Sequence, residues 1–235
     1  DENVTFETRV SVDQQAKIAR LQEAKLTLAG SPILINATVA DYDTKKQVDL
    51  KVDASIAMSS IYSLLPQSKK NFPPGSGLNG SLALMVTAAG TPEAMNLKMA
   101  LDLKQAEIKY GGAPAKPAGS PMDFKLEANY TPKSPTATGS FSAAALSYTQ
   151  YHLTNLATQF TYADQKADIK DLGFDLFNGH FSVGAHVDMT KQQNPAWDLN
   201  FHIEHLDINT ALTESAKHPD VLTGSGNLDL SLKGT

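Results

Sequence analysis

Apolar and polar residues alternate along much of the chain. In the clearest run, Met95 to Leu103, every odd-numbered residue is apolar and most of the residues between are polar. At about 3.3 Å per residue, this run predicts a strand of roughly 30 Å with one apolar and one polar face. Similar runs occur at Val48–Ile56, Phe124–Tyr130, Phe181–Val187 and Trp197–Ile203. Strict alternation is typical of antiparallel sheets. We therefore predict a mainly β fold, a long, curved antiparallel sheet that forms an elongated groove.

Short stretches between these runs predict turns and helices. The dipeptides Asn79-Gly80 and Asn178-Gly179 favour tight hairpin turns. Two stretches have apolar residues at helical spacing and a residue suited to begin a helix. They predict one or two short helices, at about 59–70 and 207–218.

The domain organisation depends on a Gly/Pro-rich segment at 111–121, which predicts an irregular loop. Because alternating strands resume directly after it, we expect one elongated domain over residues 1–235. Two related units, about 1–110 and 122–235, are the open alternative. A strand, a short helix and a Gly-Ser-Gly turn follow one another twice, with an offset of 149 residues. This order indicates a degenerate internal repeat, and chance similarity between two β segments is the other interpretation.

Composition and charge exclude several classes of function. The chain has 235 residues with 20 basic and 25 acidic side chains, a net charge of −5, and only two arginines, Arg9 and Arg20. It therefore lacks the arginine-rich surface of a nucleic-acid binder, and we expect no nucleic-acid partner. Without cysteine, it has no disulfide, thiolate metal site or cysteine nucleophile. The longest apolar run, Leu82–Val86, is far shorter than the about 20 residues of a membrane-spanning helix.

No motif in the chain indicates catalysis. The residues from Gly75 to Gly80 match a dinucleotide-binding glycine pattern, but an alternating strand follows where a helix is needed, which favours a turn. The histidines are densest at His202-Ile203-Glu204-His205. On a strand, His202 and Glu204 share one face while His205 lies on the other, so three metal ligands do not converge. We expect a non-enzymatic protein without catalytic residues, cofactor or metal site.

The apolar face of the predicted sheet is the best candidate for a binding surface. Aromatic residues make up only 7% of the chain, and the apolar positions are mainly Leu, Met, Val and Ala. A sheet that curves over such a face offers a groove for acyl chains rather than for flat or polar ligands. The residues expected to line this groove are Leu84, Val86, Met95, Leu97, Met99, Leu101, Leu126, Val183, Leu199 and Phe201. The alternative is an ordinary closed core in a structural or scaffolding module that has no lipid ligand.

The C-terminal region resembles proteins of the AsmA family. The stretches that carry the resemblance are LFNGHFSVGAHVD (176–188), WDLNF (197–201), LDINTAL (206–212) and LTGSGNL (222–228). They follow the family's order of hairpin, strand, short helix and strand. The resemblance covers residues 170–235 well and the rest more loosely. Asn178-Gly179 stands where Gly-Gly is common in the family.

The resemblance implies a protein of a Gram-negative cell envelope that serves envelope maintenance and outer-membrane biogenesis. It implies that this chain is a periplasmic segment of a longer protein, anchored in the inner membrane by an N-terminal helix outside the segment. Related proteins are thought to conduct phospholipids between membranes along an apolar β-groove. The expected partners are therefore phospholipid or another acyl-chain lipid, and the inner and outer membranes through the full-length protein. The scaffolding alternative implies the same location without a lipid ligand.

Overall fold

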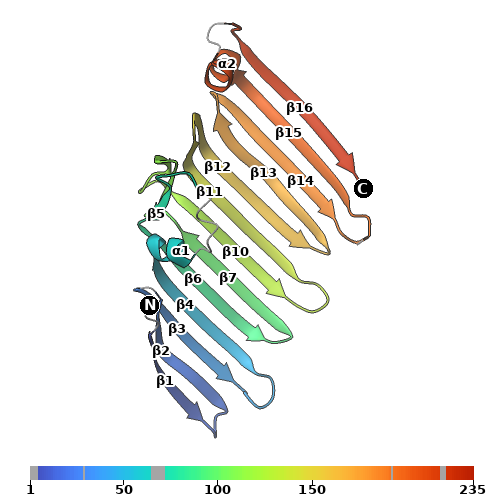
Figure 1. Ribbon diagram of the computed structural model, residues 1–235. Helices are drawn as coiled ribbons and strands as arrows, with labels where there is room; N and C mark the ends of the chain where they lie inside the picture. The colour runs from blue at the N-terminus through green and yellow to red at the C-terminus, as the bar shows by residue number, and fades with distance from the viewer. Residues whose placement is uncertain (1–4, 29, 65–71, 192, 218–220) are drawn as a thin grey trace. The chain divides into compact units, whose positions relative to one another are not determined.

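Long antiparallel strands make up most of the structure, a computed structural model that describes residues 5–28, 30–64, 72–191, 193–217 and 221–235. In this part of the chain, thirteen strands form a large antiparallel sheet and three short strands form a second sheet (Figure 1). The predicted mainly β fold, with long antiparallel strands and two short helices, is confirmed. The chain divides into two compact units. Unit 1 is Asp1–Gly119 with Asp123–Ala137, and unit 2 is Ser120–Met122 with Thr138–Thr235.

Unit 1 contributes seven strands to the large sheet, and the predicted alternating runs located three of them. Their order in the sheet is β1 (Thr5–Asp13), β2 (Ile18–Leu28), β3 (Ser31–Ala40), β4 (Gln47–Ala57), β6 (Ser81–Thr91), β7 (Ala94–Asp102) and β10 (Met122–Tyr130). The runs that begin at Val48, Met95 and Phe124 correspond to β4, β7 and β10. Since neighbouring strands are antiparallel, the apolar side chains of each can share one face of the sheet.

A helix and the small sheet form a second layer in unit 1. Helix α1 (Met58–Leu64) follows β4 and covers the first part of the helix predicted at about 59–70, whose last residues lie outside the described ones. The small sheet has the order β5 (Gly77–Asn79), β8 (Glu107–Tyr110) and β9 (Ala113–Lys116). Strand β9 falls within the segment expected to be an irregular loop.

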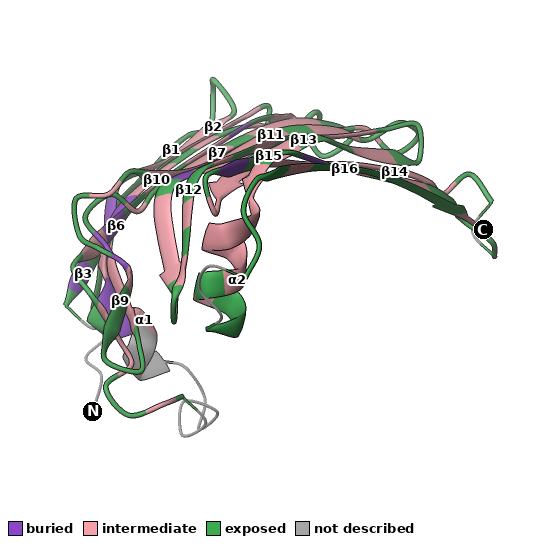
Figure 2. Ribbon diagram, turned by 90° about the horizontal axis from the view of Figure 1, so that it is seen from above, coloured by how far each residue is buried: buried purple, intermediate pink, exposed green. Residues whose placement is uncertain are grey.

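This layer packs on one end of the apolar face of unit 1. Met58 of α1, Leu82 of β6 and Ala106 are buried together, and Ile56, Ile61, Leu78, Leu84, Leu101 and Leu103 pack around them. Elsewhere burial is sparse, as the few purple segments in Figure 2 show. Only eight apolar residues of the described chain are buried, and five of these are alanines. The large apolar side chains therefore stay mostly accessible.

Gly80 lies where the chain passes from the small sheet to the large one. The dipeptide Asn79-Gly80 therefore does not form the predicted hairpin turn, because β5 and β6 belong to different sheets. Gly80 has a φ of +77°, and a Cβ there would lie 2.0 Å from the carbonyl oxygen of Gln105. Its carbonyl accepts a hydrogen bond from the amide of Met58 at 2.9 Å, which links α1 to this crossing point. The glycine pattern before it leads into strands, as the turn interpretation predicted.

Lys116 is a fully buried side chain at the end of β9. Its ammonium group donates hydrogen bonds to the carbonyl oxygens of Ala106 at 2.7 Å, Pro117 at 3.1 Å and Lys104 at 3.4 Å. Burial lowers the pKa of Lys116, and the charge of Asp102 opposes this effect. The three carbonyls belong to the segments on either side of β8 and β9, so Lys116 holds this part of the second layer together.

Replacing Lys116 with methionine is expected to destabilise β8 and β9 by about 2 kcal/mol, because buried carbonyls lose their charged donor. Hydrogen exchange of the amides in these strands should become about thirtyfold faster. Lys109→Met is the matched control, because Lys109 lies in the same sheet but is partly exposed and ion-paired with Glu107 at 3.4 Å. Its effect should be below about 0.5 kcal/mol. Equal effects of the two substitutions would contradict this role of Lys116.

Unit 2 contributes six strands to the large sheet. Their order is β11 (Thr136–Tyr148), β12 (Tyr151–Ala163), β13 (Lys166–Leu176), β14 (Gly179–Asp188), β15 (Ala196–Asp207) and β16 (Ser225–Gly234). Helix α2 (Ile208–Ala216) follows β15 and matches the helix predicted at about 207–218, of which residue 218 lies outside the described ones. The Asp207 side chain caps the helix by accepting from the Thr210 amide at 3.0 Å. Neither helix in the described ranges has the length and apolar character that a membrane crossing requires.

The hairpin predicted around Asn178-Gly179 is present, but its turn lies one residue earlier. Phe177 and Asn178 have φ values of +52° and +58°, and Leu176 pairs with Gly179 at the start of β14. Gly179 is needed for packing rather than for the turn, because a Cβ there would lie 2.7 Å from the Cα of Leu206. The neighbouring strand thus requires the glycine, and the turn uses the residues before it.

The two strand–helix–strand segments expected as a repeat have the same order of elements. In unit 1, β4 leads into α1 and the chain returns as β6, which pairs antiparallel with β4. In unit 2, β15 leads into α2 and the chain returns as β16, which pairs antiparallel with β15. In the described residues, the first segment also contains strand β5 between its helix and the returning strand, and the second segment has no corresponding strand. That the two arose by duplication stays a prediction.

Candidate functional site

The register of unit 1 aligns its apolar residues in rows that cross the sheet. Val86 lies opposite Val52 of β4 and Met99 of β7, and Met99 lies opposite Leu126 of β10. Parallel rows contain Ala54, Leu84, Leu101 and Phe124; Leu50, Ala88, Leu97 and Ala128; and Val48, Gly90, Met95 and Tyr130. The seven lining residues predicted in this unit therefore share one face, which we call the unit 1 apolar face.

The unit 1 apolar face is only partly shielded from solvent. Its predicted lining residues are all half-buried, and among its large described side chains only Leu82 is buried. At the outer strand β1, Phe6, Val10 and Val12 are 58%, 62% and 57% exposed. Side chains in one row cover one another's flanks, and the second layer covers one end. A continuous, accessible apolar surface of this kind is typical of a binding site.

Unit 2 has a similar apolar face. Val183 of β14 lies opposite Phe201 of β15 and Leu172 of β13, and Phe201 lies opposite Leu230 of β16. Leu199 lies in the next row, which also contains Ile169, Ala185 and Leu232. The three lining residues predicted in this unit, Val183, Leu199 and Phe201, therefore share its face. Ile169, Trp197, Leu228, Leu230 and Leu232 on the same face are between 41% and 48% exposed.

Aromatic rings form part of the unit 2 apolar face, although the sequence predicted only Phe201 among them as a lining residue. Phe174 and Phe181 stack with ring centroids 5.0 Å apart, and Phe181 lies 6.2 Å from Phe201. Trp197 lies over Gly234, since a Cβ at that glycine would be 2.5 Å from the indole ring. These rings add flat apolar area to a face that is otherwise aliphatic.

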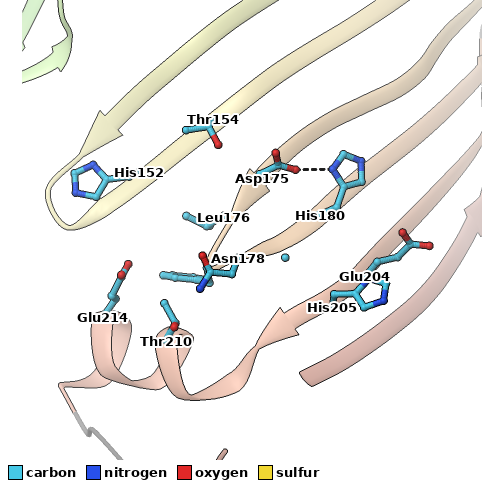
Figure 3. Close-up of a pocket in the computed structure, with 12 residues that line it drawn as sticks. His152, Thr154, Asp175, Leu176, Asn178, His180, Glu204, His205, Thr210 and Glu214 are labelled. Atoms are coloured by element: carbon cyan, nitrogen blue, oxygen red, sulfur yellow. Dashed lines mark hydrogen bonds and ion pairs between the residues drawn. The ribbon is translucent and has the colours of Figure 1, made fainter. Parts of the chain in front are cut away.

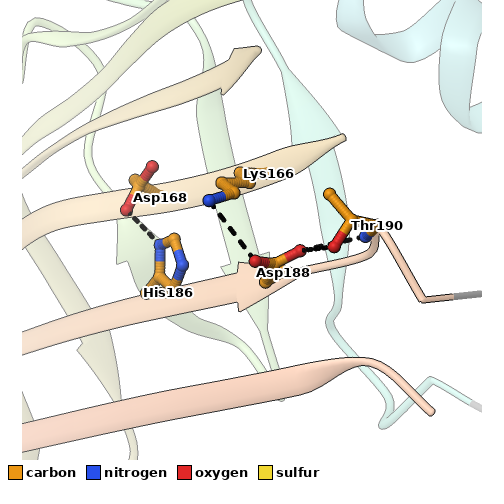
Figure 4. Close-up of polar contacts among 5 residues, drawn as sticks. All are labelled: Lys166, Asp168, His186, Asp188 and Thr190. Atoms are coloured by element: carbon orange, nitrogen blue, oxygen red, sulfur yellow. Dashed lines mark hydrogen bonds and ion pairs between the residues drawn. The ribbon is translucent and has the colours of Figure 1, made fainter. Parts of the chain in front are cut away.

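The opposite face of unit 2 is polar, and its charged residues pair across strands. His186 contacts Asp168 at 2.6 Å, and Lys166 contacts Asp188 at 3.4 Å (Figure 4). Hydrogen bonds from Thr190 lower the pKa of Asp188 to about 2, with a smaller effect of Lys166. Such exposed pairs contribute little stability individually. They do keep this face hydrated, so the two faces of unit 2 differ sharply in polarity.

His202 lies between two carboxylates on this polar face. Its Nε2 is 3.0 Å from Glu204 Oε1, and its Nδ1 contacts the carboxylate of Asp229. The hydrogen bond with Glu204 is the largest cause that raises the pKa of His202, and the contact with Asp229 adds to it. The hydrogen bond between His202 and Glu204 also lowers the pKa of Glu204. The structure thus places His202 and Glu204 on one side, as predicted. His205, which was expected on the other face, instead lines the same pocket as Glu204, because the register of β15 shifts at this point and His205 has a φ of +54°. No cluster of three possible metal ligands occurs in the described ranges.

We expect unit 2 to lose stability as pH rises through the raised pKa of His202. The contribution of the protonated imidazole is fully present below the ordinary value of 6.5 and disappears above the folded-state value. Trp197, the single tryptophan, reports the unfolding of unit 2 by fluorescence. Between pH 6 and pH 8, the urea midpoint should fall in the unmodified chain and vary less in His202→Gln. An identical pH dependence of the two proteins would contradict the assignment.

A pocket of about 610 Å³ lies at one end of the strands of unit 2. Figure 3 shows His152 from β12, His180 from β14, His205 and Glu204 from β15, and Glu214 from α2 around it. The other residues that line the pocket are Thr154, Asp175, Leu176, Phe177, Asn178, Gly179 and Thr210. Sequence reasoning missed this pocket, because its residues come from five elements and follow no common spacing.

Hydrogen bonds fix several groups of this pocket, which we call the histidine pocket. The Asp175 carboxylate contacts His180 Nδ1 at 2.7 Å and accepts a hydrogen bond from the side-chain amide of Asn155 at 2.7 Å. The hydrogen bond with Asn155 is the largest cause that lowers the pKa of Asp175, and the contact with His180 lowers it further. The Asp207 amide donates to the Phe177 carbonyl at 3.1 Å, which ties the start of α2 to the turn between β13 and β14. The walls of the pocket are therefore held in place by their own contacts.

No family model, curated protein or solved structure matches this chain. The resemblance to the AsmA family thus stays a prediction from the sequence.

Proposed function

We propose that the chain binds or conducts phospholipid acyl chains along its apolar faces, as a non-enzymatic, periplasmic segment of a cell-envelope protein. The observation that carries the proposal is that apolar side chains form continuous rows across the sheet in each unit. Very few of the large side chains in these rows are buried. Acyl chains suit such a surface, because each buried methylene gains about 0.8 kcal/mol and no directional contact is needed. Headgroups would stay in water.

The alternative, a scaffolding module with a closed core, receives less support. Among the described residues of unit 1, the buried apolar cluster consists of Met58, Leu82 and Ala106 at one end of the face. A closed core would bury most of the large apolar side chains of both faces. Instead, several are more than 40% exposed, Phe6 and Leu230 among them. This degree of exposure favours a surface that meets a ligand.

The acidic balance of the chain bears on how it would take up lipid. With a net charge of −5, the chain has no general attraction for anionic membrane surfaces. In the proposed mechanism, lipid transfer depends on apolar contact and breaks no covalent bond. The periplasmic location and the link to the inner and outer membranes are inferred from the resemblance to the AsmA family. The binding of acyl chains is inferred from the apolar faces.

Native mass spectrometry of the chain purified from bacteria tests the proposal. The expected spectrum contains adducts with the masses of phospholipids, and lipid-free chain should take up a fluorescent phospholipid. A spectrum of unliganded chain alone, together with no uptake of the fluorescent lipid, would exclude lipid binding. The scaffolding alternative predicts this second result.

A further inference from the structure

Strand β16 forms one edge of the large sheet. Among the described residues it has a single neighbouring strand in this sheet, β15. In an antiparallel pair, alternate residues direct both their N–H and their C=O away from the neighbouring strand. The outer edge of β16 therefore presents a row of backbone donors and acceptors that no strand of the described chain occupies. Such an edge is a template for pairing with a further strand.

The opposite edge of the sheet, strand β1, is less suited to pairing. Its register with β2 shifts between Glu7 and Arg9, and Arg9 is exposed beside this shift. Register shifts and exposed charges are the features by which sheet edges avoid further strands. In β16, by contrast, the residues from Leu228 to Gly234 pair with β15 without a shift. The regular edge of the sheet is thus the one at β16.

The polar side chains of β16 have an order of charges that is complementary to itself. Asp229, Ser231 and Lys233 share the polar face, with the acidic residue before the serine and the basic residue after it. Asp229 contacts His202 and Lys233 contacts Asp198 at 3.0 Å, both on the side of β15. The side chains of Asp229 and Lys233 are nevertheless 83% and 76% exposed. A strand along the outer edge can therefore contact them from the other side.

A second copy of β16 in antiparallel orientation fits this edge in one register. With Ser231 opposite Ser231 of the second copy, Asp229 of each copy lies opposite Lys233 of the other. A shift by two residues removes both ion pairs, and a shift by four places two aspartates or two lysines opposite each other. A shift by one residue would move apolar side chains to the polar face. The charges of β16 thus favour a single register.

The rows of both faces of unit 2 continue across such a pair. On the polar face, His186, Asp198 and Lys233 lie opposite one another in turn, and Asp229 of the second copy would follow Lys233. The signs of charge in this row then continue to alternate when the imidazole is protonated. On the apolar face, Leu232 lies opposite Leu230 of the second copy, so the two leucine rows meet.

We propose that two copies of this chain associate by antiparallel pairing of their β16 edges, about a two-fold axis at Ser231. Backbone hydrogen bonds provide the affinity, and the two ion pairs between Asp229 and Lys233 select the register. The arrangement is closed, so assembly ends at a dimer. It joins the unit 2 apolar faces of the two copies on one side of the sheet. The association uses the strand edge and does not depend on lipid binding.

A pair of charge variants tests the contact by sedimentation equilibrium of lipid-free chain. Lys233→Glu and Asp229→Lys each place like charges opposite one another at both contacts of a dimer, so each variant alone should associate about tenfold more weakly than the unmodified chain. An equimolar mixture restores opposite charges at both contacts and should associate like the unmodified chain. The effects of each substitution on His202 or Asp198 within its own chain are the same alone and in the mixture, which makes the mixture its own control.

Two results of this experiment would overturn the proposal. The first is an unmodified chain that stays monomeric up to about 1 mM. The second is a mixture that associates no better than either variant alone. Assemblies that grow beyond a dimer with concentration would instead show an open, head-to-tail contact and would also contradict the two-fold arrangement.

A single cysteine at position 231 tests the register, since the chain contains no cysteine of its own. Opposite residues of an antiparallel pair have Cα atoms about 4.5–5.5 Å apart, within the range of a disulfide. Under mild oxidation, Ser231→Cys should form a covalent dimer at least about tenfold faster than Ser11→Cys, which places the cysteine at an exposed position of the β1 edge. Equal rates of crosslinking for the two variants would contradict the proposed pairing.

Discussion

Replacing Met99 with aspartate is expected to abolish the uptake of fluorescent phospholipid by unit 1. Met99 lies at the centre of the unit 1 apolar face, opposite Val86 on one side and Leu126 on the other. A carboxylate in contact with an acyl chain costs about 3 kcal/mol, which corresponds to at least a hundredfold loss of affinity at that point. Uptake, measured as bound lipid per folded chain, should therefore fall to the amount that the unit 2 apolar face binds.

Ala100→Asp is the matched control for Met99→Asp. Ala100 is the next residue of β7 and lies on the opposite face, where Lys125 of β10 is directly across. The new carboxylate would therefore meet solvent and a lysine, and lipid uptake should be retained. Circular dichroism of both variants checks that the sheet is formed. Uptake by Met99→Asp as strong as by Ala100→Asp would show that lipid does not contact this face.

The largest effect on stability is expected for Gly80→Ala, at about 3 kcal/mol. A side chain at a positive φ costs about 1–2 kcal/mol. The new Cβ would also lie 2.0 Å from the Gln105 carbonyl oxygen, so the backbone must move, which adds about 1–3 kcal/mol. Hydrogen exchange in β5, β8 and β9 should become more than a hundredfold faster. The fluorescence of Trp197, which belongs to unit 2, should show an unchanged urea midpoint.

Gly77→Ala provides the comparison for Gly80→Ala. Gly77 lies three residues earlier in β5, and a Cβ there would meet no atom within 4 Å. Its substitution should change the stability of this layer by less than about 0.5 kcal/mol. If neither substitution changes the hydrogen exchange of β5, β8 and β9, the backbone around Gly80 has room for a Cβ, which contradicts the close approach of the Gln105 carbonyl oxygen.

Strand positions could be predicted from the sequence because the signal lies within each strand. The alternation from Met95 to Leu103 defines both the strand and its apolar face without reference to any neighbour. For the same reason, the predicted lining residues of unit 1 share one face once β6, β7 and β10 pair in register. The glycine at position 179 was harder to interpret. Its role depends on the backbone of Leu206, which sequence proximity does not reveal.

The histidine pocket could not be predicted, because it depends on irregular backbone and on contacts between distant residues. Asn155 and His205 have φ values of +55° and +54°, and register shifts occur at both positions. At the second shift, the Asn227 side chain accepts from the His205 amide at 2.7 Å. No sequence pattern specifies such a shift in advance, since non-glycine residues adopt positive φ only where neighbouring groups stabilise it.

Site-specific photocrosslinking along β7 tests the central claim most directly. A photoreactive phenylalanine derivative is placed at each position from Leu97 to Asp102 in turn, and crosslinked phospholipid is detected by mass spectrometry. Acyl chains on the apolar face should give lipid adducts from positions 97, 99 and 101 and none from positions 98, 100 and 102. Equal crosslinking from all six positions, or none from any, would contradict the claim that acyl chains lie on this face.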